Sequence, residues 1–202
     1  PTQENLLSPQ VGRFDLPASY GAHTVFPVPG MDIAGSAAKR DFVVITNEAL
    51  SEGCSEARQK VWMVDVTGES RPVSVADWTV DEASGNFCAR SGRFGAHSSH
   101  ENFTPVYYRR IMFIAHFNAG VRAVDIRDPY RPKEIAYYIP VITDKSDRRC
   151  AKAVHDPRCR LAVHTNNVEV DDRGYVYIVD RAGGGMHILE LTGAARKIAN
   201  FR

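Results

Sequence analysis

The chain has 202 residues, of which 44% are hydrophobic and 24% charged, and its formal net charge is +1. It is long enough to bury a sizeable core, and the composition is ordinary for a folded domain. The near-neutral charge argues against a nucleic-acid partner. No apolar stretch approaches the ~20 residues that cross a bilayer, so no membrane span is expected.

Strand-like apolar runs recur along the chain in a fixed order of four. They are rich in Val, Ile, Phe, Tyr and Trp, which suit a pleated, half-buried surface. In chain order, the predicted strands are residues 8–14 (an isolated last strand), then 25–28, 42–47, 61–66 and 73–78, then 103–106, 111–116, 121–126 and 133–138, and finally 167–170, 175–180, 186–191 and 195–201. No long helix is expected.

Short segments with glycine or proline separate most of these runs, as in hairpin turns. Residues 118–120 and 182–185 separate the second and third runs of two repeats, whereas the first repeat carries a long insertion at 49–60. Asp65, Asp125 and Glu190 are aligned near the ends of the third runs. We expect these carboxylates to accept hydrogen bonds from backbone amides of the following turns.

A histidine begins each repeat. His23, His97 and His164 lie in the segments GAHT, GAHS and AVHT, spaced 74 and 67 residues apart. A period of this length that contains four short strands is typical of a β-propeller blade. We therefore predict an all-β fold, a β-propeller of four-stranded antiparallel blades, to which the chain contributes three complete blades plus one outer strand.

The predicted organisation is a single propeller domain. Residues 1–20 hold the fourth strand of a preceding blade and a linker, and the blades with their linkers are 21–80, 81–140 and 141–202. Propellers close with roughly four to eight blades, and three blades leave two sheet faces open. We therefore expect the C-terminal portion of a longer chain and a six- to eight-bladed ring. Its remaining blades would come from the same precursor or a second chain.

The four cysteines all fall in predicted loops. Their even number and placement predict the disulfides Cys54–Cys88 and Cys150–Cys159, and with them an oxidising, extracytoplasmic location, periplasmic or secreted. Four free thiols in a cytosolic protein are the alternative. A zinc ribbon is not expected, because no Cys-x-x-Cys pair occurs.

Two segments resemble the LVIVD-repeat family. Residues 121–136 (VRAVDIRDPYRPKEIA) and 174–191 (GYVYIVDRAGGGMHILEL) carry its strands that end in an acidic residue, and the first also has its D-P-x-x-P corner. The resemblance covers most of 94–202 and less of 1–93. It implies a β-propeller, commonly exported from bacteria, without naming a reaction. Residues 96–102 (AHSSHEN) are similar to the selenium-binding protein and methanethiol oxidase group, whose propellers have histidines near the axis and a proposed metal role.

The repeated histidines are the candidate functional residues. In a propeller the first strand of each blade lines the channel, so a residue just before it sits at one channel mouth. Imidazole binds Zn, Cu and Fe; His23, His97 and His164 are therefore candidate ligands of a transition metal, with His100 as a further ring. Glu101 is the candidate catalytic residue, as a general base, or a carboxylate that orients a ligand imidazole.

Other interpretations of the histidines stay open. Propeller blades often carry a histidine that hydrogen-bonds a neighbouring blade, and a metal-free ligand site is a third reading. Two function hypotheses follow. One is an exported scaffold that binds a small-molecule or protein ligand through rim loops such as 49–60 and 141–163. The other is a metal-dependent oxidoreductase or hydrolase that uses the axial histidines. No nucleophile elbow, phosphate loop or His-Glu-x-x-His motif occurs.

Overall fold

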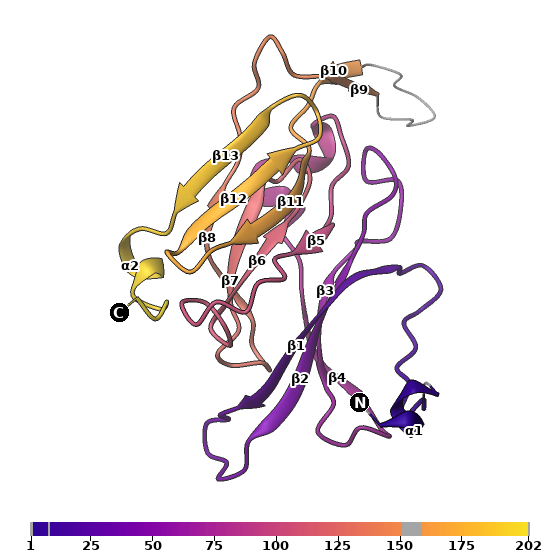
Figure 1. Ribbon diagram of the computed structural model, residues 1–202. Helices are drawn as coiled ribbons and strands as arrows, with labels where there is room; N and C mark the ends of the chain where they lie inside the picture. The colour runs from indigo at the N-terminus through magenta and orange to yellow at the C-terminus, as the bar shows by residue number, and fades with distance from the viewer. Residues whose placement is uncertain (1, 8, 151–158, 202) are drawn as a thin grey trace.

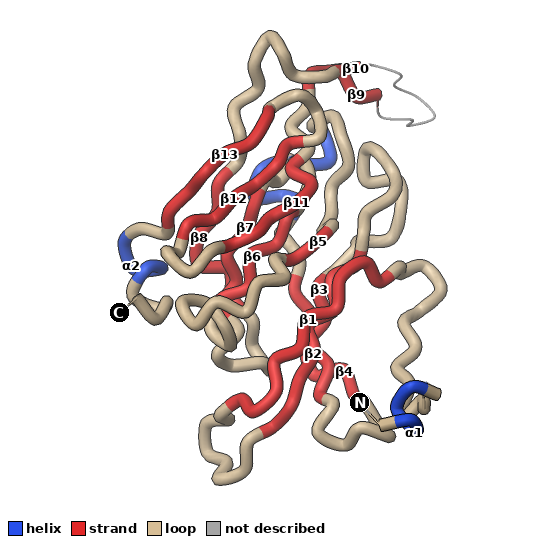
Figure 2. Tube along the Cα trace, in the orientation of Figure 1, coloured by secondary structure: helices blue, strands red, loops and turns tan. Residues whose placement is uncertain are grey.

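The computed structural model describes residues 2–7, 9–150 and 159–201, and these form an all-β fold with a few short helices (Figures 1 and 2). Three consecutive sheets and one hairpin hold the strands, and all neighbouring strands are antiparallel. The first sheet contains β1 (Ala22–Met31), β2 (Arg40–Asn47), β3 (Val61–Asp65) and β4 (Val73–Trp78). The second contains β5 (Ser98–Ser99), β6 (Ile111–Ala115), β7 (Val121–Asp125) and β8 (Lys133–Tyr138).

The third sheet has three strands, β11 (Thr165–Val170), β12 (Tyr175–Asp180) and β13 (Gly185–Glu190). Between the second and third sheets lies the hairpin of β9 (Arg148–Cys150) and β10 (Cys159–Leu161). The helices are α1 (Gln3–Leu6), α2 (Gly193–Arg196) and the 3₁₀ turns η1 (Glu82–Gly85) and η2 (Phe87–Ala89). Among the described residues no helix is long and apolar enough to cross a membrane.

The sequence located most of the strands. Every predicted second and third run is a strand, the fourth runs 73–78 and 133–138 are β4 and β8, and each sheet keeps its strands in chain order. Both predicted disulfides are present, Cys54–Cys88 and Cys150–Cys159. The predicted turn carboxylates are found at two of three positions: Asp65 accepts from the Thr67 amide at 2.9 Å and Asp125 from the Arg127 amide at 3.0 Å.

Three predicted strands are wrong. Residues 103–106 form a turn, because the Thr104 carbonyl accepts from the amides of Tyr107 and Tyr108 and Pro105 has no amide to donate. The inner strand of the second sheet is instead the short β5. Residues 195–201 contain the end of α2 and coil, so no fourth strand pairs with β13 in the described part of the chain. Residues 9–14 are not a strand either; Val11–Phe14 lie beside Val43 and Ile45 of the first sheet. Residue 8 and residues 151–158 lie outside the described residues.

The three sheets stack face to face in chain order. Successive side chains of a strand point to opposite faces, and β6 uses both of its faces. Met112 and Ile114 pack into a cluster with the first sheet, while Ile111 and Phe113 pack into a cluster with the third. Every residue of β6 is therefore buried. The described sheets do not close into a ring, so the propeller remains a prediction.

Each sheet has a forward face, turned toward the next sheet in the chain, and a backward face. The forward residues Phe42, Val44 and Met63 of the first sheet contact the second sheet, whose forward residues contact the third. The repeat assigns the same forward positions in the third sheet to the residues Tyr175, Tyr177, Met186 and Ile188. Met186 and Ile188 are 62% and 57% exposed. The described residues therefore leave this apolar sheet face of the third repeat uncovered.

Candidate functional site

The repeated histidines lie at the starts of the three inner strands, as predicted. His23 is in β1, and His97 and His164 directly precede β5 and β11. Because β5 lies beside both β1 and β11, the rings form a row. The ring centroids of His23 and His97 are 4.3 Å apart, those of His97 and Phe117 5.0 Å, and those of Phe117 and His164 4.4 Å. Phe117 therefore separates His164 from the other two histidines.

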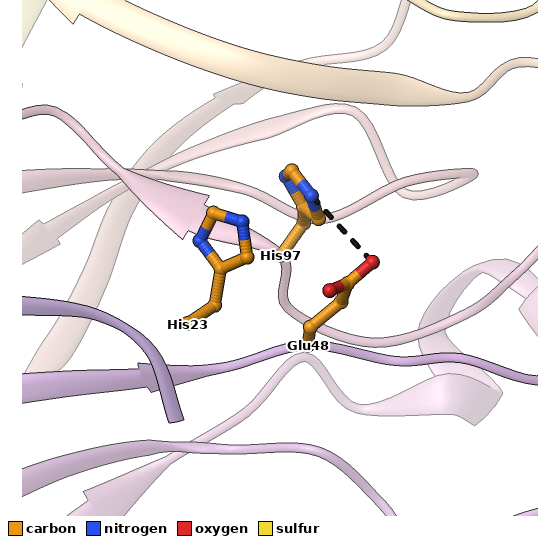
Figure 3. A group of neighbouring side chains, drawn as sticks. All are labelled: His23, Glu48 and His97. Atoms are coloured by element: carbon orange, nitrogen blue, oxygen red, sulfur yellow. Dashed lines mark ion pairs between the residues drawn. The ribbon is translucent and has the colours of Figure 1, made fainter. Parts of the chain in front are cut away.

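Glu48 completes a group with the first two histidines. It directly follows β2, and its Oε1 lies 3.7 Å from Nε2 of His97. The nearest ligand atoms of His23, Glu48 and His97 all lie within 4.8 Å of one another. In Figure 3 the carboxylate of Glu48 and the ring of His23 flank the ring of His97. We call these three residues the His–Glu–His group.

The ring of His97 is held in one orientation by its hydrogen bond to the backbone. Its Nδ1 lies 2.5 Å from the carbonyl oxygen of Asn166. Because a carbonyl only accepts, Nδ1 carries the proton and Nε2 presents its lone pair toward Glu48. Burial lowers the pKa of His97 below its ordinary value, so the ring is neutral at neutral pH. A neutral imidazole fixed through Nδ1 by a carbonyl is the usual arrangement of a metal-ligating histidine.

The other two members are less constrained. His23 is exposed, and its Nδ1 lies 2.9 Å from the hydroxyl of Thr24, which leaves Nε2 accessible. Glu48 is half-buried, and its Oε1 accepts from Nη1 of Arg93 at 3.1 Å. Arg93 also donates to the Ala49 carbonyl at 3.2 Å. The guanidinium therefore balances the carboxylate charge and fixes it beside His97.

His164 and His100, two of the predicted ligands, lie outside this group. Nε2 of His164 accepts from the Arg93 amide at 3.2 Å, and burial lowers its pKa to about 3. His100 is fully buried, its Nδ1 accepts from the Phe113 amide at 3.1 Å, and burial lowers its pKa to about 4. Both rings are neutral and use one nitrogen to satisfy a backbone amide, which is a structural use of the imidazole.

Glu101 lies near the group but not in it. Its side chain is exposed, and its amide donates to Oε2 of Glu169 at 3.2 Å. Glu101 and His23 line the same pocket of about 250 Å³, together with Ser99 and Tyr177. The predicted general base is therefore separated from His97 and shares a pocket wall with His23 only.

Repeat analysis did not find Glu48, because the equivalent residues differ. Directly after the predicted second runs, the three repeats carry Glu48, Phe117 and Arg181. Glu48 contacts His97 of the next sheet, and Phe117 stacks on His164 of the next sheet. The position of the residue was the available signal: in the first two repeats this residue contacts the histidine of the next repeat, although its side chain differs between repeats.

The His–Glu–His group offers two neutral imidazole nitrogens and one carboxylate oxygen. This donor set binds zinc in hydrolases and iron in oxygenases. A second cluster with suitable residue types, Cys54, Glu82 and Cys88, cannot offer thiolates because its cysteines form a disulfide. Comparison with protein-family models and with curated proteins found no match to this chain.

Proposed function

We propose that this chain is a segment of an exported β-propeller whose function resides in a divalent transition-metal site formed by His23, Glu48 and His97. The observation that carries the proposal is the fixed His97 ring: Nδ1 is bonded to the Asn166 carbonyl, and Nε2 lies 3.7 Å from Glu48. On this reading the stacked sheets are the scaffold, and the metal is the ligand that the scaffold holds at the starts of its inner strands.

The donor chemistry limits the metal to a few ions. Nitrogen and carboxylate ligands suit Zn²⁺, Fe²⁺ and Cu²⁺, with bonds to zinc of about 2.0–2.2 Å. Closing the group around such an ion needs movement mainly of His23, whose ring is exposed. Glu48 has two oxygens, so one can bind the ion while the other keeps its hydrogen bond to Arg93. Arg93 would then orient the ligand carboxylate.

A metal-dependent enzyme is the second candidate, and the shared pocket favours it. Three protein ligands leave coordination positions open, and such positions allow Lewis-acid or redox chemistry. The pocket of about 250 Å³ that begins at His23 would hold a substrate beside the metal. Glu101, which lines the same pocket and has an exposed carboxylate, is the group available as general base.

The partner we propose is a further sheet of the same repeat, from the same precursor or a second chain. The support is the forward face of the third sheet, where Met186 and Ile188 occupy positions that bury against the next sheet in the first two repeats. The two disulfides support export, because they form and persist in oxidising compartments.

Metal titration tests the proposed site. Protein stripped with a chelator and titrated with Zn²⁺ or Co²⁺ at pH 7.5 in a calorimeter should bind one equivalent, and Co²⁺ should produce the visible absorption of a low-coordinate site. His97→Ala and Glu48→Gln should each weaken binding by at least tenfold. His187→Ala is the control, because His187 lies in β13 and its nearest polar contact is the Tyr138 hydroxyl at 3.3 Å.

Two outcomes would contradict the metal site. One is an absence of stoichiometric binding by folded protein at pH 7.5. The other is a His164→Ala variant that loses the metal as fully as His97→Ala while its fold is retained, because Phe117 separates His164 from the proposed ligands.

A further inference from the structure

A pocket lined by arginines lies at the opposite end of β1 from His23. It has a volume of about 400 Å³, and its walls include Gly30, Tyr108, Arg109, Arg110 and Arg127. Gly30 is the second-to-last residue of β1, and Arg127 follows β7, so the first and second sheets both contribute. No residue of the His–Glu–His group lines this pocket.

The backbone of Arg109 adopts a strained conformation. Its φ of 62° lies in the left-handed region, which residues other than glycine, asparagine and aspartate rarely adopt. The guanidinium lies against Gly30, where a Cβ would be 3.3 Å from Nη2, and 5.1 Å from the centre of the Tyr108 ring. Strain of this kind persists only where the surrounding structure imposes it, and it concentrates at functional sites.

The cations of the pocket exceed its anions. Arg127 is neutralised by Asp125 at 2.8 Å, and Asp32 on the pocket wall is paired with Lys39 at 3.1 Å. Arg109 has no ion pair among the described residues, and its buried Nε has no hydrogen-bond partner there. Nη1 of Arg110 donates a long hydrogen bond, of 3.5 Å, to the carbonyl oxygen of Ile198. Arg109 and Arg110 both line the pocket, and neither has a carboxylate partner among the described residues.

We propose that this pocket binds a tetrahedral oxyanion, a phosphate or sulfate group, through Arg109 and Arg110. The planar guanidinium matches such a group with paired N–H donors and keeps its charge at any physiological pH. An oxyanion in the pocket would give the Arg109 guanidinium the charge partner that it lacks among the described residues. This site is independent of the proposed metal site, because it uses different residues at the other end of the sheets.

The test is an anion titration followed by calorimetry and by thermal unfolding. Phosphate and sulfate, added at constant ionic strength, should bind with one-to-one stoichiometry and raise Tm, while nitrate should not. Glycerol 3-phosphate serves as the second arm: tighter binding of this ester than of inorganic phosphate assigns the pocket to an esterified group, and the reverse assigns it to the free ion.

Two variants separate binding from folding. Arg109→Gly removes the guanidinium and suits the left-handed backbone, so we expect Tm without anion to be equal or higher and phosphate binding to be at least tenfold weaker. Arg110→Gln should also weaken binding. Arg71→Gln is the matched control, because Arg71 is exposed outside the pocket. The proposal is overturned if Arg109→Gly binds phosphate as wild type does, or if nitrate shifts Tm as much as phosphate.

Discussion

The second and third sheets carry the same repeat but differ in what covers them. In the second sheet every residue of β6 is buried, because the neighbouring sheets cover both faces. In the third sheet β12 alternates, with Val176 and Ile178 buried and Val179 46% exposed. The same hydrophobic positions are thus core in one sheet and surface in the other, which shows that burial in this fold is decided by neighbours and not by strand sequence alone.

The largest effect is expected when a forward-face isoleucine of the second sheet is replaced by alanine. The same replacement on the forward face of the third sheet is the comparison. Ile111 is fully buried and Ile188 is 57% exposed. Ile111→Ala should lower the free energy of unfolding by about 2–5 kcal/mol, because it removes buried methyl groups and leaves a cavity. Ile188→Ala should change it by less than about 0.5 kcal/mol. Urea denaturation measures both; equal losses would mean that the third sheet's forward face is covered in solution.

The two disulfides differ in the length of chain they close. Cys54 and Cys88 are 34 residues apart, and Cys150 and Cys159 are nine. Replacing the first pair by serine should cost about 2–4 kcal/mol of stability, and replacing the second about 1 kcal/mol less, because the longer loop gains more entropy on unfolding. Unfolding of the two double variants in urea gives the comparison, and a larger loss for the second pair would contradict it.

Lowering the pH should reduce the free energy of unfolding mainly through buried histidines of the second sheet. His116, which follows β6, is fully buried with both ring nitrogens unpaired among the described residues, and burial lowers its pKa to about 3. The unfolded chain therefore takes up protons first. Stability is intact above pH ~6.5 and falls toward pH 3, by at most about 1.4 kcal/mol per pH unit for this residue.

His116→Phe should reduce that acid sensitivity, because phenylalanine takes up no proton. Urea unfolding at pH 7, 5.5 and 4.5 would measure the slope. His187→Phe in β13 of the third sheet is the control for the same substitution made elsewhere in the fold. An unchanged slope in His116→Phe would show that other groups, such as His100 and His164, dominate the acid response.

The smallest effect concerns one of the hydroxyls that link the second and third repeats. Tyr107 is fully buried, its hydroxyl donates to the Gly174 carbonyl at 2.6 Å, and burial raises its pKa to about 12. Tyr107→Phe should cost about 1 kcal/mol, because it removes one hydrogen bond and retains the ring. Thermal unfolding is sensitive enough to detect this, and an unchanged Tm would indicate that water replaces the hydroxyl.

The sequence predicted the strands whose neighbours are also strands, and failed where local chemistry overrides the pattern. The second and third runs of the first two repeats are central in their sheets, as is β12 in the third, and alternation and β-branched content identified them. Residues 103–106 have suitable composition, yet Pro105 removes a ladder donor and Thr104 organises a turn. Gly193, with a φ of 58°, begins a helix that continues into residues 195 and 196, where a fourth strand was expected to start.

The candidate site was predicted in part for the same reason. A repeat reveals only equivalent residues, so His23 and His97 were found and brought together, whereas Glu48 was not. His164 is equivalent in sequence, but Phe117 takes the place beside it that Glu48 takes beside His97. The arginine pocket depends on backbone strain at Arg109 and on space left by Gly30, which no composition or spacing encodes.

The matching of forward and backward faces bears on how such a protein lengthens in evolution. Every contact between sheets joins a forward face to a backward face, so an internal duplication of one whole repeat creates only a contact of a kind already present. The duplicated sheet would also bring a copy of the residue after its second strand to the next histidine. Duplication followed by substitution at that one position, as in Glu48, Phe117 and Arg181, would diversify the site without disturbing the stack.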